Sequence, residues 1–175
     1  TKKQPVQYEF GFGLSYSTFE YSELKVSGPS TSSETTEAPQ FQVSLSVQNT
    51  GTVDGSEVVQ LYVKNPECDP EISRPVMELR AFQKIFLKTG EKKTITFTLD
   101  QRAFSVYSTK KKCFAPVKGN YQICIGASLK DIRLSAPVKI EGEEIEALVN
   151  TDALEKKDIF AEHPRHKKGE YTLTD

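Results

Sequence analysis

Strict alternation of apolar and polar residues over Phe41–Gln48 constrains the fold more than any other feature of this sequence. The apolar members are Phe41, Val43, Leu45 and Val47, and the polar members are Gln42, Ser44, Ser46 and Gln48. Because successive side chains of a β-strand point to opposite faces, this period of two predicts a strand with one face in a core and the other in water.

A second alternating segment ends the stretch Arg74–Leu99, which reads as two strands joined at Thr89-Gly90 and which no helix explains. Here three threonines are predicted to face water, while Ile95, Phe97 and Leu99 face a core. Further short strands, with turn residues between them, are predicted at Phe19–Ser27, Glu57–Asn65, Phe104–Tyr107, Tyr121–Ile125 and Ile132–Ile140. About seven such strands predict an all-β fold, an immunoglobulin-like or fibronectin type III-like two-sheet sandwich.

The composition divides the 175 residues into three parts. Residues 1–18 are predicted to be a linker from a preceding domain, residues 19–141 the sandwich, and residues 142–175 a poorly regular or weakly helical C-terminal extension. The strand Glu57–Asn65 carries apolar side chains on both faces, so we expect cover on both sides. The chain opens without the apolar segment of a signal peptide, which favours an excised or internal piece of a longer protein.

Charge and cysteine content disfavour several classes of function. The formal net charge is -1, so no global field attracts nucleic acid or a membrane surface, and no apolar run reaches the roughly 18 residues of a membrane span. Cys68, Cys113 and Cys124 make an odd count without a CxxC pair, so we expect neither a metal nor another cofactor. Free thiols slightly favour a reducing cytoplasm.

Four segments in fixed order carry a family resemblance: YEFGFGLSYSTFEYS, VQNTGTVDGSEVVQLYV, RPVMELRAFQKIFLKTGEKKTITFTL and KGNYQICIGASLKDIRL. Together they resemble the fibronectin type III-like domain of family 3 glycoside hydrolases, the β-glucosidase group, over about Tyr8 to Ile140. The resemblance implies a parent enzyme whose barrel and α/β domains carry the catalytic carboxylates. Those domains are then the partners of this chain, and the sandwich is a non-catalytic structural domain that stabilises them.

The same resemblance points to an interface. The stretch FGFGLSY is similar to the segment that leaves the α/β domain and enters the sandwich, so we expect Phe10, Phe12 and Tyr16 at a domain interface. Arg74 is a further candidate, because a guanidinium suits an ion pair or an interface contact with a carboxylate. Either of the loops Gly28–Pro39 and Asn65–Ser73 could reach the mouth of the parent active site.

No catalytic constellation accompanies the strands. Glycosidic cleavage needs two carboxyl groups about 5 to 9.5 Å apart, whereas the acidic residues here fall in turns and on solvent faces: Asp54, Glu57, Glu67, Asp69, Glu71, Asp100 and Asp131. The chain also has no tryptophan, which the family's nucleophile motif contains. We therefore predict no catalytic residue in this chain and no activity of the fragment alone.

Two other functions stay open. A carbohydrate- or cell-wall-binding module would stack sugars on exposed aromatics, for which Tyr62, Tyr107 and Tyr171 are candidates, although the lack of tryptophan disfavours direct sugar binding. A plain adhesion sandwich without an enzyme is the third hypothesis. Two further kinds of group are interpreted as solvated. One is the metal-like set Glu162, His163 and His166, and the other is the two basic clusters, Lys110–Lys112 and Arg165 with Lys167 and Lys168.

Overall fold

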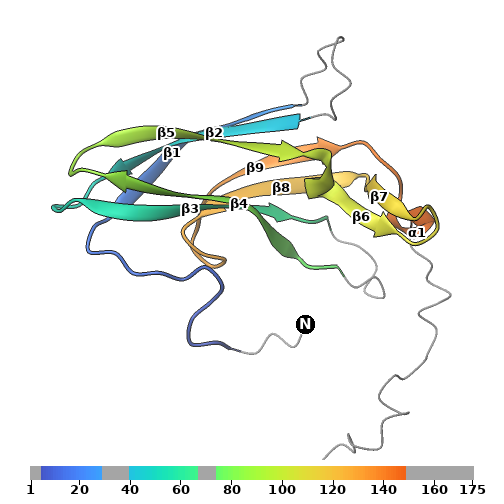
Figure 1. The fold of residues 1–175 in the computed structure, drawn as a ribbon, viewed down its shortest axis with the longest axis horizontal. Coiled ribbons are helices and arrows are strands. Elements are labelled where there is room, and N and C mark those ends of the chain that lie inside the picture. The colour runs from blue at the N-terminus through green and yellow to red at the C-terminus, as the bar shows by residue number, and fades with distance from the viewer. Residues whose placement is uncertain (1–4, 29–39, 67–73, 149–175) are drawn as a thin grey trace, which may run out of the picture.

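The computed structural model describes residues 5–28, 40–66 and 74–148, and these residues form a two-layered β-sandwich with a short hairpin at one end (Figure 1). The strands are β1 Phe19–Ser27, β2 Gln40–Asn49, β3 Gly55–Lys64, β4 Met77–Leu87, β5 Lys92–Asp100, β6 Ser105–Ser108, β7 Cys113–Pro116, β8 Gly119–Gly126 and β9 Ile132–Ile140. The all-β sandwich prediction is confirmed. The loops predicted at 28–39 and 65–73 lie largely outside the described residues, as do Cys68 and the chain after Leu148.

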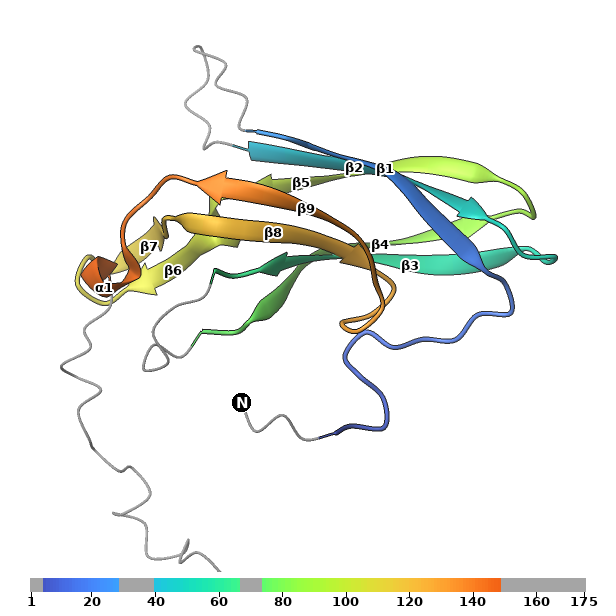
Figure 2. The same cartoon turned by 180° about the vertical axis from the view of Figure 1, so that it is seen from behind.

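Seven of these strands build the two layers, and the strand predicted at Phe104–Tyr107 belongs instead to the separate hairpin β6–β7. One sheet has the order β1-β2-β5 and the other the order β4-β3-β8-β9, with antiparallel pairing throughout. Strands β4 and β5 follow one another through Thr89-Gly90, yet they belong to opposite sheets, as Figures 1 and 2 show. The turn between them therefore carries the chain from one layer to the other.

The core lies between the inner faces of the two sheets. Its fully buried aliphatic members include Val43, Leu45, Val47, Val59, Leu61, Val63, Leu87, Ile123 and Ile125. The alternation predicted for β2 and β5 is confirmed. The apolar residues Phe41, Ile95, Phe97 and Leu99 are buried, and most of the polar residues between the apolar positions are at least partly exposed. Ser46 is the exception on the polar side of β2: it is buried because Glu23 and Thr94 cover its hydroxyl.

A buried tyrosine fixes the start of β8. The hydroxyl of Tyr121 lies 3.0 Å from the Val117 carbonyl oxygen and 3.1 Å from that of Phe104. A tyrosine that bonds back to the backbone a few residues upstream is a hallmark of immunoglobulin-like sandwiches. Its ring also meets Phe104 edge-on at 5.2 Å, so it joins the core to the chain that crosses the end of the sandwich.

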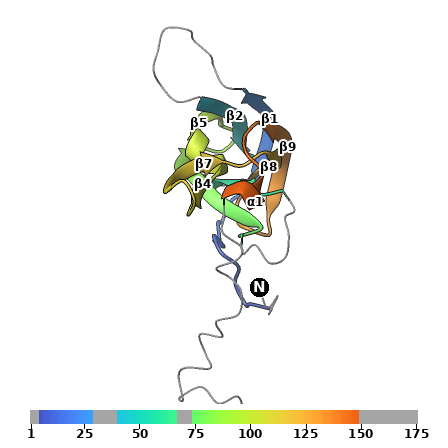
Figure 3. The same ribbon diagram turned by 90° about the vertical axis from the view of Figure 1, so that its right-hand side faces the viewer.

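The hairpin β6–β7 closes one end of the sandwich, and the short helix α1 (Ile145–Leu148) packs on it (Figure 3). Ile145 and Leu148 are buried against Ala115 and Val117, and the Ser108 hydroxyl donates to the Leu148 carbonyl oxygen at 2.7 Å. The first residues of the predicted C-terminal extension therefore pack on the sandwich's own hairpin.

Candidate domain-docking surface

The N-terminal segment, residues 8–18, crosses the outer face of the four-stranded sheet and lies beside the loop that joins β8 to β9 (Figure 2). Backbone and side-chain hydrogen bonds hold it there. The Leu129 amide donates to the Phe10 carbonyl oxygen at 3.0 Å, and the Ser128 hydroxyl donates to the Glu9 carboxylate at 2.7 Å. The Ser128 hydrogen bond lowers the pKa of Glu9. This segment is thus attached to the sheet rather than loose.

Gln60 is the central anchor of the segment. Its Nε2 donates to the Gly11 carbonyl oxygen at 3.0 Å and to the Ala127 carbonyl oxygen, while its Oε1 accepts the Tyr62 hydroxyl. Gly11 has φ +81°, and a Cβ there would lie 2.1 Å from Gln60 Oε1. Because L side chains are strained at positive φ and no space remains, only glycine allows this close approach.

The contact between Gly11 and Gln60 also covers part of the outer face of β3. The predicted cover on both sides is confirmed for Tyr62, which is 1% exposed beneath the N-terminal segment, whereas Val58 on the same face stays 38% exposed. Burial raises the pKa of its hydroxyl. The expectation that Tyr62 is free to stack on a sugar is therefore wrong, because Gly11 and Gln60 occupy the space around its hydroxyl.

Large apolar side chains remain exposed around this anchor. Phe82 and Phe86 of β4 pair in register with Gln60 and Ser56 of β3, so they share the outer face with Val58. We call the exposed apolar side chains of this region the docking face: Phe10, Phe12, Leu14, Val58, Phe82 and Phe86. Phe82 is 67% exposed and Leu14 is 91% exposed, and an exposed apolar group of this size is typical of a surface that meets another protein.

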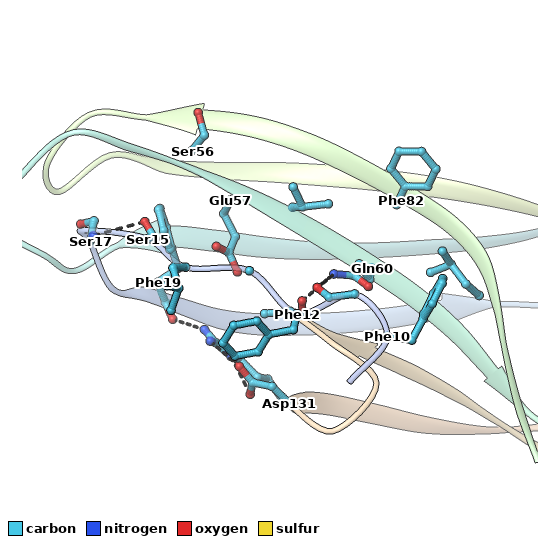
Figure 4. A pocket seen from close by; sticks show the side chains of 17 residues that line it. Phe10, Phe12, Ser15, Ser17, Phe19, Ser56, Glu57, Gln60, Phe82 and Asp131 are labelled. Atoms are coloured by element: carbon cyan, nitrogen blue, oxygen red, sulfur yellow. Dashed lines mark hydrogen bonds and ion pairs between the residues drawn. The ribbon is translucent and has the colours of Figure 1, made fainter. Parts of the chain in front are cut away.

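A pocket of about 520 Å³ lies between the N-terminal segment and the sheet (Figure 4). Phe10, Phe12 and Phe82 form apolar walls, and Glu57, Gln60, Asp131 and Arg133 add polar groups. Figure 4 shows the Glu57 side chain pointing from β3 toward the side of the pocket that holds Phe12 and Phe19. The docking face therefore borders a pocket whose lining includes the carboxylate of Glu57, a residue of the inner face of β3.

The charged groups of the pocket are held differently. Glu57 Oε1 accepts the Tyr21 hydroxyl at 2.8 Å, and burial raises the pKa of both groups. Arg133 lies over the Tyr21 ring at 4.8 Å and donates to the Phe19 carbonyl oxygen at 2.6 Å. It also donates to both oxygens of Asp131, which lowers the pKa of that carboxyl. Asp131 is thus held in an ion pair and is not set up as a nucleophile.

The predicted interface residues do not all meet. Phe10 and Phe12 lie together on the docking face, and Tyr16 is fully exposed farther along the same segment. Arg74 lies elsewhere: its guanidinium donates to the Tyr121 hydroxyl at 3.2 Å, at the start of β8, whereas the pocket lies beyond the end of that strand. The carboxylate contact expected for Arg74 does not occur among the described residues. The interface role of all four residues stays a prediction.

The other candidates add no site in the part of the chain that the structure describes. Tyr107 is half exposed and meets Phe114 edge-on at 5.4 Å, with Arg102 over the Phe114 ring. Lys111 pairs with Glu143. No group of three metal-ligating residues occurs within residues 5–28, 40–66 and 74–148, and the set Glu162, His163 and His166 lies outside them.

Over these same ranges, no helix has the length and apolar character to cross a membrane.

Comparison with known proteins identifies the fold family. The family model described as "Fibronectin type III-like domain" matches residues 57–129. Thermostable β-glucosidase B of Acetivibrio thermocellus is 43% identical over 133 residues, 76% of this chain and 17% of the relative. The crystal structure of a GH3 β-glucosidase of Bifidobacterium adolescentis superposes with a TM-score of 0.70 at 40% identity, covering 79% of this chain and 19% of that one. This chain contains a fibronectin type III-like domain that matches part of GH3 β-glucosidases.

Other relatives of this fibronectin type III-like domain carry different names. An exo-α-(1→6)-L-arabinopyranosidase of Bifidobacterium breve is 39% identical over 143 residues, 82% of this chain and 18% of the relative. The chain thus spans under one fifth of the length of these curated relatives. The fibronectin type III-like domain is, in each of them, one part of a much larger enzyme.

Proposed function

We propose that this chain is a non-catalytic structural domain that docks on the catalytic domains of a family 3 glycoside hydrolase and stabilises their placement. The docking face carries this proposal. Four phenylalanines, a leucine and a valine lie exposed on and around an anchored N-terminal segment, and apolar surface of this kind gains free energy when another protein covers it.

The size of the relatives supports a division of labour. Matching regions cover 17% to 18% of the first curated relatives, so most of each enzyme lies outside the part that resembles this chain. One of those relatives is named a β-glucosidase and another an arabinopyranosidase, yet each is about 40% identical to this domain. A domain common to enzymes with different sugars fits a structural role better than sugar recognition.

We infer the following arrangement for the parent. Residues 1–18 enter from an α/β domain, residues 19–141 form the sandwich, and residues 142–175 extend beyond it. Phe10, Phe12 and Tyr16 then meet the α/β or the barrel domain, and Arg74 makes a separate contact. Two carboxylates of those domains carry out retaining hydrolysis, for which about 5 to 5.5 Å between carboxyl groups is required.

Two measurements test this proposal. The 175-residue chain should show no turnover of an aryl β-glucoside above background, whereas the full-length parent should show turnover. In the parent, Phe82→Asp should lower the thermal unfolding midpoint, because the substitution places a carboxylate in a buried apolar contact. Robust turnover by the fragment, abolished by one internal carboxylate substitution, would contradict the non-catalytic part. An unchanged midpoint would contradict the docking part.

Carbohydrate binding is the alternative, and Tyr107 with Phe114 is the observation that favours it. These two rings are each half exposed on the β6–β7 hairpin. They meet edge-on rather than in one plane, and Arg102 lies 4.1 Å from the Phe114 centroid, so little flat ring surface remains for a sugar. Calorimetry with cello-oligosaccharides decides between the two: we expect no heat of binding.

A further inference from the structure

One carboxylate that lines the pocket beside the docking face, that of Glu57 on the inner face of β3, lacks a close cationic partner. Glu57 is half-buried, and its printed contact is the Tyr21 hydroxyl on Oε1. Within residues 5–28, 40–66 and 74–148, no ion pair of 4.0 Å or less joins Glu57 to a lysine or an arginine. A partly buried charge without such a partner is costly, and this one opens into a pocket of about 520 Å³.

Arg133 is the nearest cation, and its guanidinium is already engaged. It donates from Nε and Nη2 to Asp131, and from Nη1 to the Phe19 carbonyl oxygen. The positive charge of Arg133 lowers the pKa of Glu57 through space, but burial raises that pKa by more, so the pKa of Glu57 remains raised. The ion pair of Arg133 with Asp131 is neutral as a unit, so the pocket keeps the single negative charge of Glu57.

The walls of the pocket suit a planar cation. Phe10, Phe12 and Phe82 line it, and the face of an aromatic ring attracts a guanidinium or an ammonium within about 6 Å. The Gln60 side-chain amide donates both of its N–H groups to backbone carbonyl oxygens and accepts the Tyr62 hydroxyl. It therefore does not compete with an incoming cation for the Glu57 carboxylate. A carboxylate acceptor and aromatic rings in the lining of one pocket are a combination that arginine satisfies with both its charge and its flat face.

We propose that this pocket receives an arginine side chain of the adjoining catalytic domain, with Glu57 as the acceptor and the phenylalanines as stacking walls. The inference rests on the proposed docking of this face and names the chemistry of the partner at its centre. The apolar face then supplies area, while the Glu57–arginine contact fixes the register of the two domains.

The first experiment uses n-propylguanidinium as a probe on the 175-residue chain, followed by NMR. We expect shifts of the backbone amides of Ser56, Gln60 and Asp131, with a dissociation constant on the order of millimolar for so small a ligand. Glu57→Gln keeps the acceptor for Tyr21 but removes the charge, and it should weaken binding roughly tenfold or more. Glu20→Gln, on exposed β1, is the matched control and should bind as the wild type does.

The neutral isostere n-propylurea separates charge from shape. Equal binding of n-propylurea, or binding that Glu57→Gln leaves unchanged, would overturn the cation pocket. Stronger binding of n-propylammonium than of n-propylguanidinium would overturn the assignment to arginine and favour lysine.

The second experiment distinguishes this inference from the docking proposal in the full-length parent. Glu57→Gln and Val58→Asp should each lower the thermal unfolding midpoint, and only the effect of Glu57→Gln should fade at high salt. If Val58→Asp acts and Glu57→Gln does not, the docking proposal stands and the cation pocket is wrong. If neither acts, docking through this face is itself wrong.

Discussion

The two outer faces of this sandwich differ in how they meet their surroundings. On the three-stranded sheet, the outer side chains are polar or charged, and several bond to one another: the Ser46 hydroxyl donates to the Glu23 carboxylate at 2.7 Å, and the Lys92 ammonium group donates to the same carboxylate. On the four-stranded sheet, the outer side chains include Phe82, Phe86 and Val58, which are exposed and apolar and cannot form such bonds. A sheet face that satisfies its own polar groups needs only water, whereas an apolar face gains stability from a neighbour.

Introducing a charge should change the free energy of unfolding very differently on the two outer faces, and this is the largest effect that we expect. Val58→Asp on the apolar face should lower the free energy of unfolding of the full-length parent by about 3 kcal/mol, because docking would bury an unpaired carboxylate. Thr96→Asp on the polar face should change it by less than about 0.5 kcal/mol, since that side chain stays in water. Urea unfolding of both variants measures the two effects. Equal losses would remove the distinction between the faces.

The attachment of the N-terminal segment is the next largest effect. Gly11→Ala should detach the segment at a cost of about 1 to 3 kcal/mol, because the residue has φ +81° and its Cβ would meet Gln60. Hydrogen exchange of the Leu129 amide, which donates to Phe10, should become faster. Gly13→Ala is the matched control, since no atom lies within 4 Å of its Cβ, and unchanged exchange is expected there. Unchanged exchange in Gly11→Ala as well would show that the anchor is not needed.

The charge inside the apolar face should appear in the pH dependence of stability. Burial raises the pKa of Glu57 above its ordinary 4.5, so its contribution is fully present below that pH and is lost as the pH rises through the raised value. In urea unfolding of the 175-residue chain, the wild type should therefore lose stability relative to Glu57→Gln on going from about pH 4 toward neutral.

Asp131→Asn should behave in the opposite way, which makes it a control for sign. Arg133 lowers the pKa of Asp131 below its ordinary 3.8, so the wild type should gain stability relative to this variant as the pH rises toward 3.8 and lose it on acidification. If the stability of the wild type instead rises relative to that of Glu57→Gln with increasing pH, the Glu57 carboxylate is stabilised by a charge partner in the isolated chain.

The smallest effect should come from the polar face. Lys92→Ala removes an exposed ion pair of 2.7 Å with Glu23, and exposed pairs contribute about 0 to 1 kcal/mol. The change in free energy of unfolding should fall in that range and shrink in salt. A loss well above 1 kcal/mol would mean that this face also carries structural strain or a hidden contact.

Local pattern was enough for the strands of the two sheets, whereas the short strand β7 was not predicted. In β2 and β5 one face of each strand packs in the core and the other, apart from the buried Ser46, is at least partly exposed to water, so burial follows from the period of two at nearly every residue. The apolar residues on both faces of β3 also predicted cover on both sides, and Tyr62 lies beneath the N-terminal segment. The resemblance to family 3 enzymes drew attention to Phe10 and Phe12 but named none of their contacts.

The site itself was beyond sequence reasoning for a physical reason. The Gln60 contacts join residues 49 and 67 positions apart, and the Tyr21–Glu57 hydrogen bond joins residues 36 positions apart. No local period encodes such meetings, and Glu57 and Asp131 were assigned to turns and solvent faces on local grounds. An acidic residue in line with the inward positions Val59 and Leu61 of the same strand was the one available signal.

The sequence alone determined that this chain is an all-β sandwich, because alternation of apolar and polar residues follows directly from the geometry of a strand. Only the tertiary structure decided that β4 and β5 part into opposite layers, that the N-terminal segment lies on the β3 face, and that Glu57 opens into an aromatic-walled pocket. These depend on packing between residues remote in the chain, and the free energy of such packing is a property of the assembled layers rather than of any single segment.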